Sequence, residues 1–247
     1  MPKLAPTSTR TRRQRGSISA EEIVNGAFEV ARRGSLDQLS MPTLAEHLGV
    51  GVTSIYWYFR KKEDLLNAMT DVAVAKYVRE MPVFAPGTPW QQILGEYFAA
   101  QRRIHREDEI LSDLLMIRTS TYSRDATRRV FELVEGVVAH LVAAGFTPAN
   151  ALRVFNTISV YTRGVIIHGR ILQLSNAPTL DSRQKRMTDW SSMPILAGLL
   201  DDYDLAGTRD EDFEFGVARL ICGFEVLLSE QEAPRPKRAV RAKKKAG

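Results

Sequence analysis

Residues 41–59 restrict the possible folds of this chain more than any other segment. Ala45 places a small side chain where two helices would touch, and Gly49, four positions later, can adopt the left-handed backbone conformation that a sharp turn requires. Four apolar residues would hold the two helices together: Leu44, Leu48, Val50 and Ile55. The segment therefore predicts a helix-turn-helix whose short second helix runs from Val52 to Tyr58.

Signals that start and stop helices recur along the chain, and no convincing run of alternating β-branched residues interrupts them. Ser19 and Glu22 fit a capping box that begins a first helix, and Gly34 is a natural end for it. Ser40 can cap the second helix, which Gly49 ends. These signals predict an all-α protein with a three-helix N-terminal head that contains the helix-turn-helix.

The same signals divide the remainder of the chain into longer helices. We expect a fourth helix from about Glu63 to Pro82, a fifth opening at Thr88-Pro89, one from Ser123 to Gly145, a long apolar helix from Thr147-Pro148 to about Leu174, and a last helix that a capping box at Thr208–Glu211 begins and that ends near Ser229. Residues 175–207 predict a long loop with one short helix near residues 195–200.

The charges of the chain are unevenly distributed. Residues 1–16 contain five basic side chains and no acid, and residues 234–247 contain seven basic side chains and no acid. Because these twelve positive charges exceed the formal net charge of +5, residues 17–233 carry a net charge of −7. An acidic body with basic ends is expected to meet an anionic partner at those ends, and nucleic acid is the favoured one.

The sequence indicates a cytoplasmic protein. The single cysteine, Cys222, cannot form an internal disulfide, so nothing requires an oxidising compartment. The N-terminal arginines precede no apolar stretch, and no uncharged run approaches the ~18 residues of a membrane span. We therefore expect no contact with a membrane.

Catalytic and metal chemistry find little support in the sequence. The glycines of Gly49-Val50-Gly51 are explained by the turn, so they do not indicate a phosphate-cradling loop. The four histidines show no metal-ligand spacing. We therefore predict that the chain is not an enzyme and has neither a cofactor nor a metal.

Two stretches resemble the DNA-binding signature of the TetR family of repressors. They are Leu44-Ala45-Glu46-His47-Leu48-Gly49-Val50 and Ile55-Tyr56-Trp57-Tyr58-Phe59-Arg60-Lys61-Lys62-Glu63-Asp64-Leu65-Leu66. A weaker similarity to the tetracycline-repressor branch follows in Phe213-Glu214-Phe215-Gly216, in Ile221-Cys222-Gly223-Phe224-Glu225 and at Gly164. The resemblance implies a ligand-responsive repressor that binds palindromic operator DNA as a homodimer.

The resemblance also implies a division into domains. We assign residues 1–16 to a disordered basic arm and residues 17–66 to a helix-turn-helix DNA-binding domain. Residues 67–231 would form a larger helical domain for ligand binding and dimerisation, and residues 232–247 a disordered basic tail.

The implied DNA contacts centre on the helix from Val52 to Tyr58, which would lie in the major groove. Thr53, Ser54, Trp57 and Tyr58 match positions that face base edges, and Ser40, Thr43, Tyr56 and Lys62 match positions that hold phosphates. This helix contains no Arg, Asn or Gln, so bidentate reading of guanine or adenine is excluded there. Thymine-methyl contacts, hydroxyl groups and DNA shape would supply more of the specificity.

The N-terminal arm is a further candidate for DNA contact. Residues 17–65 contain five basic and seven acidic side chains, so the head has little bulk attraction for a polyanion. We expect the arm, through Arg12, Arg13 and Arg15, to supply phosphate and minor-groove affinity. The alternative is a solvated arm that binds nothing.

The apolar helix after Pro148 and the last helix are candidates for the dimer interface. Seven of their apolar residues recur at helical spacing: Ile158, Tyr161, Val165, Phe213, Val217, Leu220 and Phe224. Three glycines, Gly164, Gly216 and Gly223, would permit close approach. We expect a four-helix interface between two subunits, and the alternative is that these residues only form the core of one chain.

The resemblance places an effector cavity inside the larger domain, with altered chemistry. Val78, Met116 and His168 occupy the positions where tetracycline repressors hold the drug and magnesium, so neither is expected here. We expect a small apolar or amphipathic effector in an apolar cavity. Its predicted contacts are Val78, Tyr97, Gln101, Met116, Val138, Phe155 and His168.

Two other functions remain open at this point. The chain could be a DNA-coating protein that binds through its basic tails without regard to sequence, or a family member that activates transcription. A footprint distinguishes the first, because a repressor protects one palindrome whereas a coating protein covers DNA uniformly.

Overall fold

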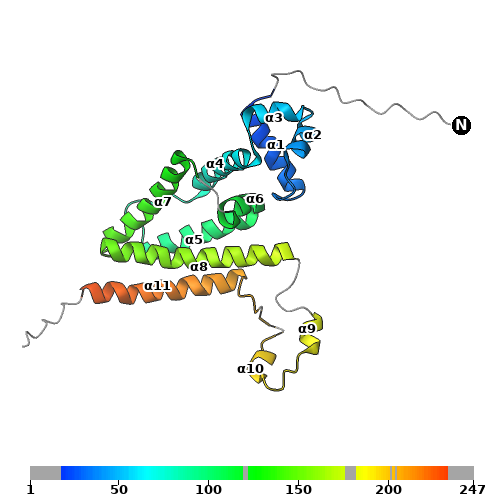
Figure 1. Ribbon diagram of the computed structural model, residues 1–247. Helices are drawn as coiled ribbons and strands as arrows, with labels where there is room; N and C mark the ends of the chain where they lie inside the picture. The colour runs from blue at the N-terminus through cyan, green and yellow to red at the C-terminus, as the bar shows by residue number, and fades with distance from the viewer. Residues whose placement is uncertain (1–17, 119–121, 176–181, 201, 204, 233–247) are drawn as a thin grey trace, which may run out of the picture.

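The computed structural model describes residues 18–118, 122–175, 182–200, 202–203 and 205–232, and this part of the chain is helical and contains no strand. Its elements are α1 (Ala20–Arg33), α2 (Met41–Leu48), α3 (Val52–Tyr58), α4 (Lys62–Glu80), α5 (Trp90–Glu107), α6 (Glu109–Ser112), the π-helix η1 (Asp113–Ile117), α7 (Arg124–Ala143), α8 (Pro148–Ser175), α9 (Ser182–Met187), α10 (Pro194–Ala197) and α11 (Asp210–Glu232). The predicted all-α class and the division into a three-helix head and a larger helical body are confirmed (Figure 1).

The first two helices of the head begin and end where the capping residues indicate. The Ser19 hydroxyl accepts from the Glu22 N–H at 3.1 Å, while the Glu22 carboxylate accepts from the Ser19 N–H at 2.8 Å, which completes the predicted capping box. α3 covers the predicted range, Val52–Tyr58. Fully buried aliphatic side chains from all three helices, Ile23, Leu44 and Ile55, form the centre of the head.

The body is a bundle in which α4 leads away from the head and α5, α7 and α11 pack against the long α8 (Figure 1). The predicted boundaries of α4, α7 and α8 and the predicted start of α5 agree with the structure within a few residues. α11 lies along α8, where the Tyr161 and Phe213 rings stack with centroids 5.8 Å apart. No helix within the described ranges is both long and apolar enough to cross a bilayer.

The body differs from the prediction in its short elements and in the start of its last helix. The short elements α6, η1 and α9 were not predicted, because each is too short for a helical period to be recognised and α9 is mostly polar. α10 lies at the place of the predicted short helix. α11 begins at Asp210, and its first helical hydrogen bond runs from the Phe213 N–H to the Arg209 carbonyl at 3.1 Å. Arg209 therefore occupies the cap position that the sequence assigned to Thr208.

The residues expected between two subunits mostly pack inside one chain. Ile158, Phe213 and Val217 are buried between α8 and neighbouring helices of the same molecule, and a Cβ on Gly216 would collide with the hydroxyl of Tyr161. These residues therefore belong to the core of one chain, which was the alternative to a place in the dimer interface. Other apolar side chains of α8 and α11 remain exposed in the single chain, namely Val160, Ile171, Leu174, Phe215 and Val226.

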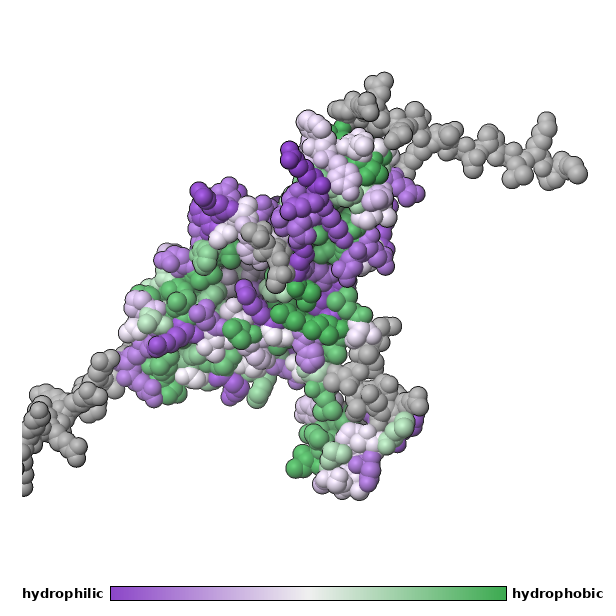
Figure 2. All heavy atoms as spheres, viewed as in Figure 1, coloured by the Kyte–Doolittle hydropathy of each residue, from purple (hydrophilic) through white to green (hydrophobic). Residues whose placement is uncertain are grey.

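The segment that contains α9 and α10 extends away from the bundle (Figure 1). Hydrophobic side chains gather on it (Figure 2), and the exposed ones include Met187, Ile195, Leu196 and Tyr203. Only Leu200 in this part of the described chain is buried. The segment therefore has an apolar surface of its own.

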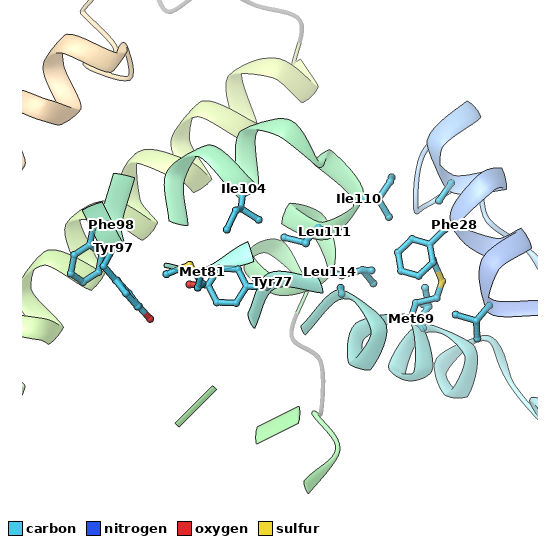
Figure 3. Packing of buried hydrophobic residues seen from close by; sticks show 14 of the residues in the cluster. Phe28, Met69, Tyr77, Met81, Tyr97, Phe98, Ile104, Ile110, Leu111 and Leu114 are labelled. Carbon is cyan, nitrogen blue, oxygen red and sulfur yellow. The ribbon is translucent and has the colours of Figure 1, made fainter. Parts of the chain in front are cut away.

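One hydrophobic core connects the head to the body. Phe28 of α1 points toward Met69 of α4 and toward Ile110, Leu111 and Leu114, which α6 and η1 contribute (Figure 3). An ion pair between Lys76 Nζ and the Asp108 carboxylate, 2.6 Å long, ties α4 to the start of α6. α4, α6 and the head therefore share packed side chains, so a displacement of one of these helices would change contacts in the head.

Candidate nucleic-acid interface and effector-binding site

The turn between α2 and α3 fixes the orientation of α3 on the head. Gly49 has φ 66° and ψ 31°, the left-handed conformation that its position requires. The Val50 N–H donates to the Ala45 carbonyl at 3.0 Å, which closes the end of α2. Because Ile55 is fully buried beneath α3, the opposite face of this helix is directed outward.

The outward face of α3 presents aromatic and hydroxyl groups. Trp57 is 79% exposed and Tyr56 46% exposed, and Thr53 is exposed beside them. Val52 and Ser54 are half-buried. A tryptophan this exposed gains little from its own fold, so its position indicates a surface that meets a partner.

Tyr58 has a second role that the sequence did not reveal. Its hydroxyl donates to the Ile18 carbonyl at 2.7 Å, and its ring makes an edge contact with Trp57 at a centroid distance of 4.8 Å. The first described residue of the chain is thereby fixed beside α3. Arg12, Arg13 and Arg15 of the predicted arm lie outside the described residues, as do residues 233–247 of the predicted tail.

Three of the four predicted phosphate-binding residues lie at two helix starts, and the fourth, Tyr56, lies on α3. Ser40 and Thr43 cap α2 reciprocally: the Ser40 hydroxyl accepts from the Thr43 N–H at 3.2 Å and the Thr43 hydroxyl accepts from the Ser40 N–H at 3.0 Å. Lys62, the first residue of α4, directs its ammonium group toward the Leu36 and Asp37 carbonyls at 3.5 and 3.4 Å. Thr43 is exposed, whereas Ser40 and Lys62 are half-buried.

A polar contact between α1 and α2 was not predicted. His47 Nε2 lies 2.8 Å from the Glu29 carboxylate, and its Nδ1 lies 3.3 Å from Arg33. The i, i+4 spacing of Glu29 and Arg33 on one face of α1 is the signal that could have revealed it. The contact holds the helix-turn-helix against α1.

The predicted effector residues fall into three groups. Tyr97, Gln101 and Phe155 are buried in the centre of the body, where the Tyr97 and Phe155 rings lie 5.8 Å apart. Val78, Met116 and Val138 are half-buried, and Val78 and Val138 pack against the core. His168 is exposed on α8, so the structure does not bring its side chain into the core.

A row of buried polar side chains follows one face of α5, and sequence reasoning identified only part of it. Tyr97, Gln101 and His105 are spaced by four residues, and Tyr77 of α4 faces them, as Figure 3 shows for Tyr77 and Tyr97. Burial raises the pKa of Tyr77 well above its ordinary value, and the neighbouring Tyr97 raises it further. Burial, together with the charge of Arg163, lowers the pKa of His105 to about 4, so this histidine is neutral at pH 7.

Several atoms of this region have no hydrogen-bond partner. They are Gln101 Oε1, both ring nitrogens of His105, Ser112 Oγ and Thr162 Oγ1, all buried. Each such atom costs roughly 1–3 kcal/mol relative to its hydrated state. A body that keeps several of them is suited to a ligand that supplies donors and acceptors.

Comparisons with known proteins agree with this architecture. The family model "Bacterial regulatory proteins, tetR family" matches residues 23–69, and "Tetracyclin repressor-like, C-terminal domain" matches residues 85–228. The chain is 38% identical over 237 residues to an HTH-type transcriptional repressor of Mycobacterium tuberculosis, covering 94% of this chain and 90% of the relative. It is 26% identical to the class E tetracycline repressor protein of Escherichia coli, with 87% and 94% of the two chains covered.

Solved structures show the same fold. A possible TetR family transcriptional regulator from Streptomyces coelicolor superimposes with a TM-score of 0.66 at 22% identity, covering 85% of this chain and all of that one. The Streptomyces coelicolor protein ActR in complex with actinorhodin gives a TM-score of 0.64 at 20% identity, covering 87% and 99%. The matches span both the head and the body, and the chain therefore belongs to the TetR family of transcriptional repressors, which are DNA-binding regulators and not enzymes.

Proposed function

We propose that the protein is a cytoplasmic, homodimeric repressor that binds one palindromic operator through α3 and leaves it when a small molecule occupies the body. The exposure of Trp57 and Tyr56 on a helix fixed by the Gly49 turn is the observation that carries the proposal. In this account residues 17–66 form the DNA-binding domain, and residues 67–231 bind the ligand and the second subunit.

In the proposed complex α3 enters the major groove. Thr53, Ser54, Trp57 and Tyr58 approach base edges with hydroxyl and aromatic groups, while Val52 can contact a thymine methyl. Ser40, Thr43, Tyr56 and Lys62 bind phosphates from the flanks of the helix. The cap at the start of α2 supports this role, because a helix N-terminus attracts a phosphate.

The arm completes the proposed DNA contact. Arg12, Arg13 and Arg15 would reach the minor groove beside each head. The hydrogen bond from Tyr58 to the Ile18 carbonyl supports this placement, because it fixes the start of the head next to the end of α3.

The second subunit is proposed to pack on the outer faces of α8 and α11. Val160, Ile171, Phe215 and Val226 are exposed apolar residues of these two helices, and burying them would stabilise a pair of chains by roughly 25 cal/mol per Å² of apolar surface. Two heads held about 34 Å apart could then enter successive major grooves.

The effector is proposed to be a small apolar or amphipathic molecule that enters the centre of the body. Tyr97, Gln101 and Phe155 would contact it directly, with Val78, Met116 and Val138 around them. His168 would take part only after α8 or a second subunit redirects it. The unpartnered Gln101 oxygen supports the proposal, since an effector could satisfy it.

Selection of bound DNA from a random library, followed by footprinting, tests the operator part of the proposal. The expected result is a two-fold symmetric consensus and one protected site. Uniform protection would indicate a DNA-coating protein instead. Transcription from a promoter that contains the selected site then separates repression from activation, and a compound screen for release identifies the effector.

A further inference from the structure

A cavity of 270 Å³ lies where α5, α6 and α8 meet the residues that precede α11. α5 contributes Arg102 and His105 to its wall, α6 contributes Ser112, and α8 contributes Ile166, Gly169 and Arg170. None of the residues proposed to contact the effector lines this cavity. It is therefore a different site, one helical turn beyond Gln101 along α5.

Two deeply buried side chains in the cavity wall have no hydrogen-bond partner. His105 is 3% exposed and Ser112 is 1% exposed, and neither ring nitrogen of the histidine nor the serine oxygen is bonded. The neutral His105 ring offers one N–H donor, and the Ser112 hydroxyl offers another. Donors buried without a partner are rare in native proteins, and here both belong to residues that line the cavity.

The charged residues that line the cavity are all basic. Arg102, Arg106 and Arg170 contribute to its wall, and no acidic side chain does. The Arg102 and Arg106 guanidinium groups share the Asp210 carboxylate, two positive charges on one negative charge. The Arg102 guanidinium also donates to the Thr208 carbonyl at 2.6 Å, and that of Arg170 donates to both Asp113 oxygens at 2.7 and 2.8 Å. These contacts hold the guanidinium groups in place before any ligand arrives, which reduces the entropy lost on binding.

Most of the remaining wall is apolar. Val165, Ile166 and Leu172 of α8 contribute aliphatic side chains, and Gly169 leaves space between them. A Cβ built on Gly169 would meet nothing within 4 Å. The cavity therefore combines hydrogen-bond donors and two guanidinium groups that share one carboxylate with a hydrocarbon surface.

We propose that this cavity binds an organic carboxylate with an apolar body. The carboxylate accepts hydrogen bonds from His105 and Ser112 close to the Arg102 guanidinium, and the hydrocarbon part lies against Ile166. The proposal goes beyond operator recognition and release, and it does not require that the chain bind DNA.

Isothermal titration calorimetry on the full chain tests the proposal with 4-phenylbutyrate and octanoate as probes, each beside its uncharged amide. We expect an acid to bind about tenfold or more tightly than its amide, because a charge-assisted hydrogen bond to a buried donor is lost in the amide. Arg102→Gln should weaken binding of the acid by a similar factor. Arg103→Gln is the matched control, since Arg103 pairs with Glu107 on the surface and does not line the cavity.

A second variant blocks the cavity without removing a charge. Gly169→Leu should abolish binding by filling the open space, and it should fold because leucine favours a helix over glycine. Gly136→Leu on the exposed side of α7 is its control and should bind like the unaltered chain.

The proposal is overturned if neither acid binds at millimolar concentration, if acid and amide bind equally, or if Gly169→Leu binds as well as Gly136→Leu. Operator binding is measured on the same preparations without any acid. A chain that binds operator but no acid refutes this inference alone, whereas a chain that binds acid but no operator refutes the proposed repressor function alone.

Discussion

Replacing Asp113 with alanine tests how the body holds the segment that connects it to the head. Asp113 begins η1, and its carboxylate accepts two hydrogen bonds from Arg170 of α8 at 2.7 and 2.8 Å. The Arg170 side chain is 8% exposed and that of Asp113 is 12% exposed. The substitution therefore leaves a buried guanidinium without its main partner.

The expected loss in the free energy of unfolding is about 3 kcal/mol. Removing one member of a buried ion pair typically costs about 3–5 kcal/mol. The lower end of this range applies because Arg170 keeps its ion pair with Glu109. The Arg170 nitrogen and the Glu109 oxygen lie 2.9 Å apart, and the Glu109 side chain is 57% exposed. For a chain of this size, about 3 kcal/mol corresponds to a decrease in Tm of about 6–12 °C.

Thermal unfolding followed by circular dichroism measures this loss. Glu132→Ala is the matched control, because it breaks an ion pair with Arg128 in which both side chains are about 60% exposed, and such pairs contribute roughly 0–1 kcal/mol. The double variant Asp113→Leu with Arg170→Met should recover most of the loss, since no charge is then buried. If Asp113→Ala had the same Tm as Glu132→Ala, the stabilising role assigned to the ion pair between Asp113 and Arg170 would be wrong.

Three further predictions concern pH, the turn and the arm. The pKa of His105 is about 4 in the folded chain and about 6.5 when unfolded, so the free energy of unfolding should decrease by about 3 kcal/mol as the pH falls from 6.5 toward 4. Urea titrations of His105→Phe should lack this decrease, and the same dependence on pH as in the unaltered chain would contradict the prediction. Gly49→Ala should cost about 1–2 kcal/mol, because a Cβ there meets no atom but the backbone is left-handed, whereas Gly95→Ala inside α5 should be neutral or stabilising in the same urea titration. Deleting residues 1–16 should weaken operator binding and flatten its dependence on salt in fluorescence anisotropy; equal slopes would show that the arm makes no phosphate contact.

Most of the fold could be predicted because residues at the helix ends form capping signals that the sequence shows. The Ser19–Glu22 capping box, the glycine at 49 and the start of α7 after Ser123 are local signals, and local hydrogen bonds decide where such helices begin and end. The short elements α6, η1 and α9 carry no comparable signal. Their positions depend on contacts with distant helices, which a sequence pattern does not contain.

The candidate sites were predictable to different degrees. The outward face of α3 followed from helical spacing, because Ile55 had to face the core. The partner of Tyr58 and the burial of His105 could not be predicted, since each depends on how separate segments of the chain meet. The apolar residues of α8 and α11 were located correctly on their helices, but the sequence could not show which of them face the same chain and which face solvent.

Operator affinity of Trp57→Ala tests the central claim most directly. Trp57 is 79% exposed and contacts only its neighbour Tyr58 among the ring contacts of the described head, so the substitution should leave the melting temperature nearly unchanged. Phe131→Ala on α7 is the control, because Phe131 is also an exposed aromatic residue, at 66%, but lies far along the chain from α3.

Anisotropy titrations with the selected operator should give a Kd for Trp57→Ala about tenfold or more above that of the unaltered chain, with Phe131→Ala unchanged. A folded Trp57→Ala chain that bound the operator as tightly as the Phe131→Ala chain would contradict the placement of α3 in the major groove.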